Sequence, residues 1–226
     1  QVIAFDLTSW QALDAAYEYL QEQGVPCGRG TAEEAADRHV QGFIWLLDPT
    51  GNRIELLARP HDSARRYFPS RDAGVTGFGH VGLCTTDPVR DQTFWLKHFN
   101  AMVSDWIGPC PLMRVNPRHH QMALFPSTRK GIQHINYQVQ DFDDVMRSYY
   151  FLKDQGIKIV FGPGRHATSG GIFVYFEGPD GMVYEYSNSD RKIIEDPANY
   201  RPRQFPMHPS SFCVWGAKPD IAEFKE

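Results

Sequence analysis

The chain has 226 residues, which is enough for one large domain or two small ones with a sizeable buried core. Hydrophobic residues make up 42% and charged residues 22%, and the formal net charge at pH 7 is -4. This balance is ordinary for a globular protein and lacks the basic excess that nucleic-acid binding requires. No apolar run approaches the roughly 18 residues of a membrane span, so we expect neither a nucleic acid nor a membrane as partner.

The spacing of the cysteines bears on the cellular compartment in which the protein works. Cys27, Cys84, Cys110 and Cys213 are far apart and form no Cys-x-x-Cys pair. Their spacing predicts neither a disulfide framework nor a zinc knuckle. The sequence also opens without a basic, apolar and small-residue export signal. We therefore expect a protein of the reducing cytoplasm.

The first predicted unit covers about residues 1–60. Residues 2–5 have the pattern of a strand, and residues 12–24 predict an amphipathic helix that ends at a Gln-Gly pair. Residues 43–56 predict two strands joined by a Pro–Gly turn. Because a strand begins at the second residue, we expect that residues preceding Gln1 are missing from this numbering.

The second unit covers about residues 77–126. Its first strand carries His80 at the end of Gly-Phe-Gly-His, and Asp87 follows seven residues later. The aspartate is placed to cap the N-terminus of a helix that runs through residues 94–96. The last strand of the unit, residues 121–125, contains no carboxylate.

The third unit covers about residues 131–189 and repeats this order. His134 takes the position of the earlier histidine in its own first strand, and Asp141 again follows after seven residues. A helix is predicted for residues 144–156. The hairpin of residues 173–186 then matches the hairpin of the first unit.

Each unit therefore predicts one strand, one helix and two or three further strands. Three units is an odd number for a fold built from pairs, which again supports a missing first copy. The following residues, 190–226, are rich in proline and charge. We expect their apolar patch, residues 212–215, to pack back on the body, and residues 220–226 to fray.

A candidate metal site follows from the repeats. If the second and third units pack about a pseudo-twofold axis, His80 and His134 converge, and Glu185 on a neighbouring strand completes the set. Two imidazoles and one carboxylate on one face of an ion leave three positions open, as Fe(II) oxygen chemistry requires. The alternative is that Glu55 and Glu185 merely end hairpins, which suits Glu55, because its unit has no histidine on the first strand.

Three more residues are candidates for the chemistry. His120 belongs to a His-His pair on a predicted strand, where alternation would point one ring into a cavity and the other outward; an exposed pair is the alternative. His166 ends a predicted tight loop, residues 162–166. Tyr175 shares strand parity with Phe173 and would face the metal, although an ordinary strand aromatic is the alternative.

These motifs together resemble a known family, the type I extradiol dioxygenases of the vicinal oxygen chelate superfamily, and in particular its 2,3-dihydroxybiphenyl 1,2-dioxygenase-like members. The spacing fits throughout, with 14 residues from His120 to His134 and ten from Tyr175 to Glu185. The resemblance covers about residues 75–190. The motifs that carry it are Gly79-His80-Val81-Gly82-Leu83, Asn116-Pro117-Arg118-His119-His120, Gln133-His134, Gly162-Pro163-Gly164-Arg165-His166, Tyr175, Asp180-Gly181 and Glu185.

The resemblance implies an α+β fold of repeated βαβββ modules, the glyoxalase and bleomycin resistance-like fold, with curved sheets around a metal site. Residues 1–62 would be a remnant, the second module, of the non-catalytic N-terminal domain. Residues 75–189 would form the catalytic domain of two modules. Residues 190–226 would be a C-terminal tail packed on the body.

The resemblance also implies roles for the candidate residues. His80, His134 and Glu185 match the metal ligands, which hold Fe(II), with Mn(II) as the alternative. His120 matches the acid–base histidine, and His166 and Tyr175 match residues that hydrogen-bond the catechol and oxygen species. The implied activity is meta-cleavage of a catechol by O2 in aromatic compound degradation, by a homo-oligomer.

Two other functions stay open. One is another metal-dependent enzyme of the superfamily, such as a glyoxalase-like isomerase or an epimerase, which needs a His–Glu pair in each unit. The other is a protein that binds an aromatic compound without chemistry, which metal analysis would separate. Four residues, Trp106, Leu112, Met113 and Phe176, allow a roomy apolar pocket and a bicyclic or alkyl-substituted catechol, with core packing as their alternative.

Overall fold

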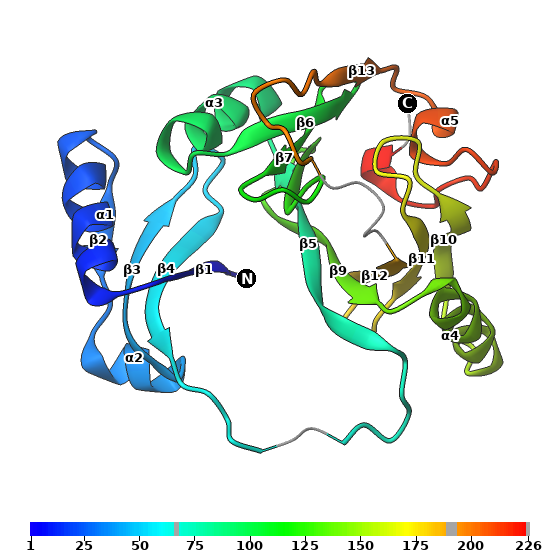
Figure 1. The fold of residues 1–226 in the computed structure, drawn as a ribbon, viewed down its shortest axis with the longest axis horizontal. Coiled ribbons are helices and arrows are strands. Elements are labelled where there is room, and N and C mark those ends of the chain that lie inside the picture. Colours follow the sequence, from blue (N-terminus) through cyan, green and yellow to red (C-terminus); the bar gives the residue numbers. More distant parts are fainter. Residues whose placement is uncertain (66–67, 189–193, 225–226) are drawn as a thin grey trace. The chain divides into compact units, whose positions relative to one another are not determined.

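The computed structural model describes residues 1–65, 68–188 and 194–224. The chain divides into two compact units, Gln1–Pro69 and Ser70–Glu226 (Figure 1). Each unit is built from mixed sheets and a few helices. Among the described residues, no helix is both long and apolar enough to cross a bilayer.

The first unit is one module with a four-stranded sheet. The first strand lies parallel to the last, in the order β1-β4-β3-β2. The predicted strand, helix and hairpin are all present. A further short helix, α2, was not predicted, although Thr31 and Glu34 form a capping box at its start. The elements are β1 (Ile3–Leu7), α1 (Trp10–Glu22), β2 (Cys27–Arg29), α2 (Ala32–Asp37), β3 (Val40–Leu47) and β4 (Arg53–Pro60).

Glu55 on β4 forms ion pairs with two arginines. Its side chain is buried, with Oε2 2.8 Å from Arg38 Nε and Oε1 2.9 Å from Arg53 Nε. Two guanidinium groups therefore compensate the buried carboxylate. This agrees with the sequence-based alternative in which Glu55 supports a hairpin.

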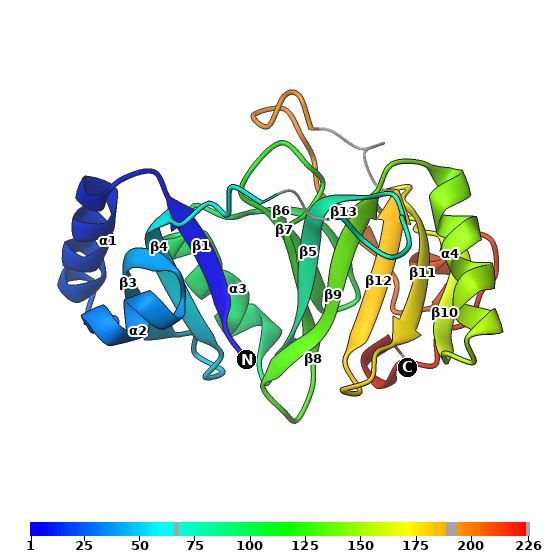
Figure 2. The ribbon, with the colours of Figure 1, turned by 90° about the horizontal axis from the view of Figure 1, so that it is seen from below.

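The second unit contains two modules in one nine-stranded sheet. In both modules the first strand lies parallel to the fourth, followed by the third and the second. Figure 2 shows β5, β9, β12 and β11 side by side. The elements are β5 (Val75–Thr85), α3 (Pro88–His98), β6 (Met102–Ile107), β7 (Cys110–Arg114), β8 (Met122–Pro126), β9 (Gly131–Val139), α4 (Phe142–Asp154), β10 (Ile159–Arg165), β11 (Ile172–Glu177) and β12 (Val183–Asn188).

The two modules meet at their first strands. β5 pairs antiparallel with β9, and the complete order is β10-β11-β12-β9-β5-β8-β7-β6-β13. The pseudo-twofold arrangement therefore brings equivalent positions of β5 and β9 next to one another. This arrangement confirms the predicted α+β fold of repeated βαβββ modules.

The helix boundaries follow the predicted capping residues. Asp87 and Asp141 accept hydrogen bonds from the first backbone N–H groups of α3 and α4. The helices α1 and α4 are both followed by a glycine, Gly24 and Gly156, each with φ of +69°. A left-handed residue in this position favours glycine and ends the helix.

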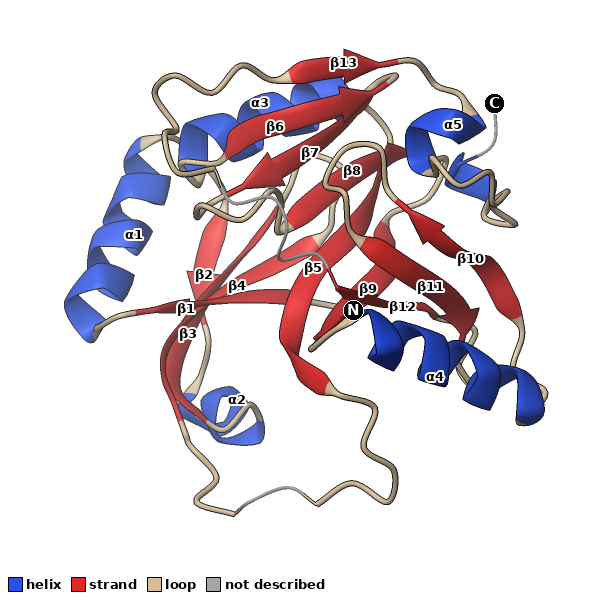
Figure 3. Cartoon of the chain, turned by 45° about the vertical axis from the view of Figure 1, so that its right-hand side comes forward, coloured by secondary structure: helices blue, strands red, loops and turns tan. Residues whose placement is uncertain are grey.

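Helix α4 covers one face of its module, where it lies along the sheet (Figure 3). Its apolar side packs on Val139 and Val174. The opposite face, here called the inner face, buries Phe161, Phe173 and Tyr175. The inner face therefore has its own apolar core, and the candidate site residues lie within it.

The C-terminal segment contributes to that inner core. It contains β13 (Arg203–Phe205), α5 (Pro209–Phe212) and a 3-10 helix (Ala222–Phe224). Phe212 and Cys213 are buried there, as predicted, whereas Val214 and Trp215 are about half exposed. The predicted fraying is wrong for residues 220–224, because Ile221 and Phe224 are buried. Residues 225–226 lie outside the described part of the chain.

Candidate active site

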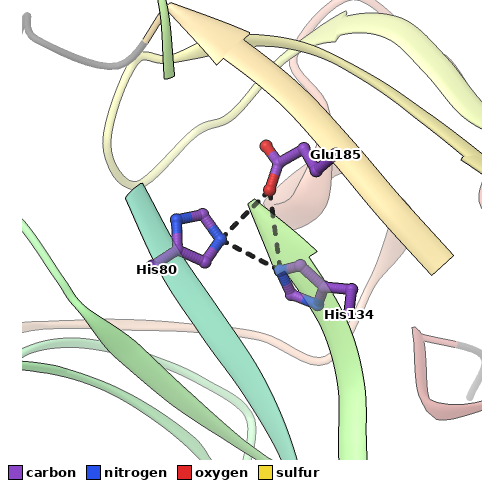
Figure 4. A group of neighbouring side chains, drawn as sticks. All are labelled: His80, His134 and Glu185. Atoms are coloured by element: carbon purple, nitrogen blue, oxygen red, sulfur yellow. Dashed lines mark hydrogen bonds and ion pairs between the residues drawn. The ribbon is translucent and has the colours of Figure 1, made fainter. Parts of the chain in front are cut away.

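The predicted trio, His80, His134 and Glu185, lies on three adjacent strands, β5, β9 and β12. In the register, His134 is opposite Gly82 on β5 and Val183 on β12. All three side chains lie on the inner face and are at least 96% buried. Figure 4 shows the two imidazoles and the carboxylate pointing toward one another.

The three tips are close enough to share one ion. The Nε2 atoms of His80 and His134 are 2.9 Å apart, and Glu185 Oε2 lies 3.0 Å from the first and 3.5 Å from the second. Ligand atoms on one face of an octahedral ion with bonds of about 2.1 Å lie about 3.0 Å apart. Glu185 Oε2 is buried and accepts no geometrically satisfactory hydrogen bond among the described residues. The residues therefore fit a divalent cation.

The orientation of His134 is set by its neighbours. Its Nδ1–H donates to the side-chain carbonyl of Gln133, so that a neutral ring presents the Nε2 lone pair to the other two residues. The ring occupies space left free by Gly82, because a Cβ at that position would overlap it. The sequence motif that contains Gly82 thus makes room for the imidazole.

Electrostatic interactions favour the metal-binding protonation states of His134 and Glu185. Burial, together with the nearby His80, lowers the pKa of His134 to about 3. Burial alone would raise the pKa of Glu185, but His80 and His166 hold this pKa well below its ordinary value. A neutral imidazole and an ionised carboxylate are the forms that bind a metal ion.

His120 lies on a loop rather than on the predicted strand. Residues 115–121 connect β7 and β8 and form an isolated bridge only at Arg118. Asn116 Oδ1 accepts a hydrogen bond from the Arg118 N–H, and this turn removes the alternation of a strand. The predicted outward ring is therefore wrong, because His119 is buried and the His120 ring lies 4.3 Å from that of His80.

His166 follows the end of β10, so the predicted tight loop is in fact a bulged strand. Its Nδ1–H donates to the carbonyl of Phe212 over 2.8 Å, and its ring stacks on Phe173 at 4.0 Å. Its Nε2 lies 3.3 Å from Glu185 Oε1 and 3.3 Å from the hydroxyl of Tyr175. The C-terminal segment thus positions a histidine beside the trio.

Tyr175 lies on β11 and shares the inner face with Phe173, as the strand parity predicts. Its ring is 5.2 Å from the His134 ring. Burial and the carboxylate of Glu185 raise the pKa of Tyr175 well above its usual value. The phenol is therefore protonated at neutral pH and is a hydrogen-bond donor in the site.

The four residues considered for an apolar pocket separate into different environments. Leu112 belongs to the inner-face core, and Met113 is fully buried. Trp106 donates through its indole N–H to Gln92. Phe176 lines a groove of about 680 Å³ together with Tyr137, Tyr184 and Tyr186, which is on the face opposite to Tyr175. Of the two roles predicted for these residues, pocket lining and core packing, core packing describes Met113 best.

Several residues around the site were not predicted. Behind the His-His pair, the buried carboxylate of Asp105 forms an ion pair with the half-exposed Arg203, and Asp105 also contacts His119. A signal existed for Asp105, because a Ser-Asp pair stands between apolar residues in the segment 102–107. Phe224 from the C-terminal 3-10 helix packs 6.3 Å from the His134 ring, and no local pattern indicates this contact.

Comparison with known proteins identifies the family. Residues 77–186 match the Glyoxalase/Bleomycin resistance protein/Dioxygenase superfamily. A 3-methylcatechol 2,3-dioxygenase of Pseudomonas putida is 31% identical over 207 residues, covering 84% of this chain and 70% of the relative. An iron-dependent extradiol dioxygenase of Rhodococcus jostii is 27% identical over 215 residues, covering 84% and 72%.

Solved structures agree on the fold. The crystal structure of BphC, a halotolerant catechol dioxygenase, superposes with a TM-score of 0.85 at 24% identity, covering 96% of this chain and 74% of that one. The modules, the matched segment and the relatives lead to one conclusion. The chain belongs to the type I extradiol dioxygenases of the vicinal oxygen chelate superfamily, enzymes that use O2 to cleave a catechol ring beside its two hydroxyl groups.

Proposed function

We propose that this protein is an Fe(II)-dependent dioxygenase whose ion is held by His80, His134 and Glu185. The observation that carries the proposal is the convergence of two imidazole Nε2 atoms and a carboxylate oxygen in a buried setting. The name of the Rhodococcus relative, an iron-dependent extradiol dioxygenase, supports iron. Mn(II) accepts a similar ligand set and is the alternative metal.

When bound, the ion would supply Lewis acidity and open positions for the two catechol oxygens and O2. The other roles belong to the protein. Burial keeps bulk water away from the reacting groups and strengthens each charge interaction among them. The neighbouring Gln133 and Gly82 fix one ligand ring in place before substrate arrives.

His120 is proposed as the general acid–base. Its ring lies against the ring of His80 and therefore next to the ion position. Burial lowers the pKa of His120 well below its usual value, with His80 adding to the effect, so the ring is neutral at pH 7. A neutral imidazole can accept the proton of a catechol hydroxyl and return it later to an oxygen atom of the opened ring.

His166 and Tyr175 are proposed to hold substrate and oxygen groups in place. Both side chains lie within hydrogen-bonding distance of each other and next to Glu185. The Tyr175 hydroxyl can donate a hydrogen bond at neutral pH, and His166 is fixed by the Phe212 carbonyl. Their proposed function is orientation, so each should matter less than the acid–base residue.

The substrate is proposed to be a substituted catechol, degraded in aromatic compound catabolism. The Pseudomonas relative acts, by its name, on 3-methylcatechol, which supports an alkyl substituent. We also infer a homo-oligomer in the cytoplasm. None of the four cysteines, all of which lie in the described residues, forms a disulfide, which is consistent with a reducing compartment.

Anaerobic loading with Fe(II), followed by a screen of substituted catechols, tests the proposal. We expect one O2 to be consumed per catechol and a yellow ring-opened product to form. Glu185→Ala should lose iron and activity, whereas the control Glu177→Gln, at an exposed carboxylate of the adjacent strand, should keep both. Iron-loaded protein that consumes no O2 with any catechol would refute the proposal.

A further inference from the structure

Two buried side chains, His119 and Asp105, lead away from the site behind His120. Asp105 on β6 has Oδ2 2.8 Å from Nε2 of His119. The other ring nitrogen of His119, Nδ1, lies 2.9 Å from Nδ1 of His120. His119 is 3% exposed and Asp105 is fully buried. Such a buried chain has few alternative arrangements, since each polar group needs its partner.

Asp105 can only accept hydrogen bonds in this environment. Arg203 donates its backbone N–H over 2.9 Å and its Nε–H over 3.1 Å to Oδ1, and its Nη2–H over 2.5 Å to Oδ2. The Tyr200 hydroxyl donates over 3.4 Å to Oδ1. Burial would raise the pKa of Asp105, but the bonds from His119 and Arg203 lower it well below its usual range. The carboxyl is therefore ionised.

Because the Asp105 carboxylate only accepts hydrogen bonds, it determines which ring nitrogen of His119, and in turn of His120, carries a proton. His119 must carry a proton on Nε2, because the Asp105 oxygen opposite it has none to give. A neutral His119 then has a bare Nδ1. The contact between the two Nδ1 atoms needs one proton, and with a neutral His119 that proton comes from His120. His120 is thereby left with a bare Nε2.

We propose that His119, oriented by Asp105, is a positioning residue that holds His120 in its Nδ1–H tautomer. The inference rests on the proposed function, in which His120 is the base. In the proton transfer, the O–H bond of the catechol breaks and an N–H bond forms at His120 Nε2. The Nδ1–H bond of His120 to His119 persists, so the resulting imidazolium is stabilised along the chain that ends at the Asp105 carboxylate.

Substitution of the carboxylate tests the mechanism. Asp105→Asn replaces an obligate acceptor by a group that can donate to His119 Nε2, which favours the opposite tautomer of both rings. We expect kcat to fall about 10- to 100-fold with KM and iron content unchanged. The control Tyr200→Phe removes the longest of these hydrogen bonds and leaves the contact between Asp105 and His119, so its kcat should stay within about threefold.

A direct readout of the tautomer keeps the inference falsifiable if Asp105→Asn does not fold. Long-range ¹H–¹⁵N spectra of the protein loaded with diamagnetic Zn(II) identify the protonated ring nitrogen, and His120→Gln assigns the signals. We expect a proton on His120 Nδ1 in the wild-type protein. A proton on Nε2 instead, or equal kcat for Asp105→Asn and Tyr200→Phe, would overturn the inference.

The spectra also separate the two hypotheses. Failure of the wild-type protein to cleave any catechol, combined with a proton on His120 Nδ1, would refute the proposed function and leave the tautomer assignment in place. Ring cleavage combined with a proton on His120 Nε2 would refute the tautomer assignment alone.

Discussion

The Nε2 atoms of His80 and His134 lie 2.9 Å apart although the residues are 54 positions apart in the chain. Each histidine comes from the first strand of its module, and the antiparallel pairing of β5 with β9 places them side by side. Because the Nδ1 of His134 donates to Gln133, a lone pair of this ring points at its neighbours. A cation between these atoms would be bound by that lone pair together with His80 and Glu185.

Metal removal should therefore destabilise the protein. A ligand present at 100 times its Kd stabilises the folded state by about 2.7 kcal/mol, which corresponds to a Tm shift of about 5–10 °C for a chain of this size. Calorimetry of the iron-loaded protein with and without chelator measures the shift. Glu185→Ala serves as control and should have the same Tm in both conditions. An unchanged Tm in the wild-type protein would contradict a shared ion.

The space at Gly82 provides a second prediction. A Cβ there would overlap the His134 ring, whereas a Cβ at Gly77 would meet no heavy atom within 4 Å. Both glycines lie on β5. We expect Gly82→Ala to weaken metal affinity about 10- to 100-fold by displacing the ring, and Gly77→Ala to leave it unchanged. Competition titrations with a metal indicator compare the two, and equal affinities would show that the ring position is unimportant.

Replacement of His120 should separate chemistry from metal binding. General acid–base catalysis typically contributes about 10²–10⁴-fold, so His120→Phe should lower kcat by that factor. The iron content should remain at the wild-type level, because the ring contacts His80 without being one of the converging ligand atoms. Single-turnover kinetics and metal analysis on the same sample test this, and a wild-type kcat would remove His120 from the mechanism.

Tyr175→Phe should have a smaller effect. The substitution keeps the aromatic packing on the inner face and removes one hydroxyl that lies 3.3 Å from His166. A lost hydrogen bond of about 1 kcal/mol corresponds to about a fivefold decrease in kcat/KM. Steady-state kinetics of the iron-loaded variant measure it. A loss as large as that of His120→Phe would mean that the phenol takes part in proton transfer.

Asp105 should make stability depend on pH. Its folded-state pKa is lowered, so its contribution is fully present above the unfolded value of about 3.9 and is lost as the pH falls through the folded value. Asp105→Asn should therefore be less stable than the wild type at pH 7. The difference in unfolding free energy, measured in urea, should shrink below pH 4. A difference that is constant with pH would contradict a depressed pKa.

The repeats explain why the fold was predictable. Hairpin turns, aspartate caps such as Asp87 and Asp141, and glycines after helices are local signals, and their recurrence fixed the modules. The convergence of His80, His134 and Glu185 could be predicted because strand alternation and a pseudo-twofold relation between two modules are sufficient to bring these side chains together. The module topology confirmed that relation.

The rest depended on tertiary contacts. The sequence predicts a strand at His119 and His120, but the turn at Asn116 breaks the alternation. The carboxylate partner of His119, Asp105, comes from β6. Phe224 packs near His134 from the far end of the sequence. Neither contact leaves a periodic signal, because each joins segments with no common repeat.

Anomalous diffraction at the iron edge, from crystals of the Fe(II)-loaded protein grown anaerobically, tests the central claim most directly. The account predicts a single strong peak within about 2.0–2.3 Å of His80 Nε2, His134 Nε2 and Glu185 Oε2. A peak elsewhere, or one bonded to fewer than all three of these atoms, would contradict it.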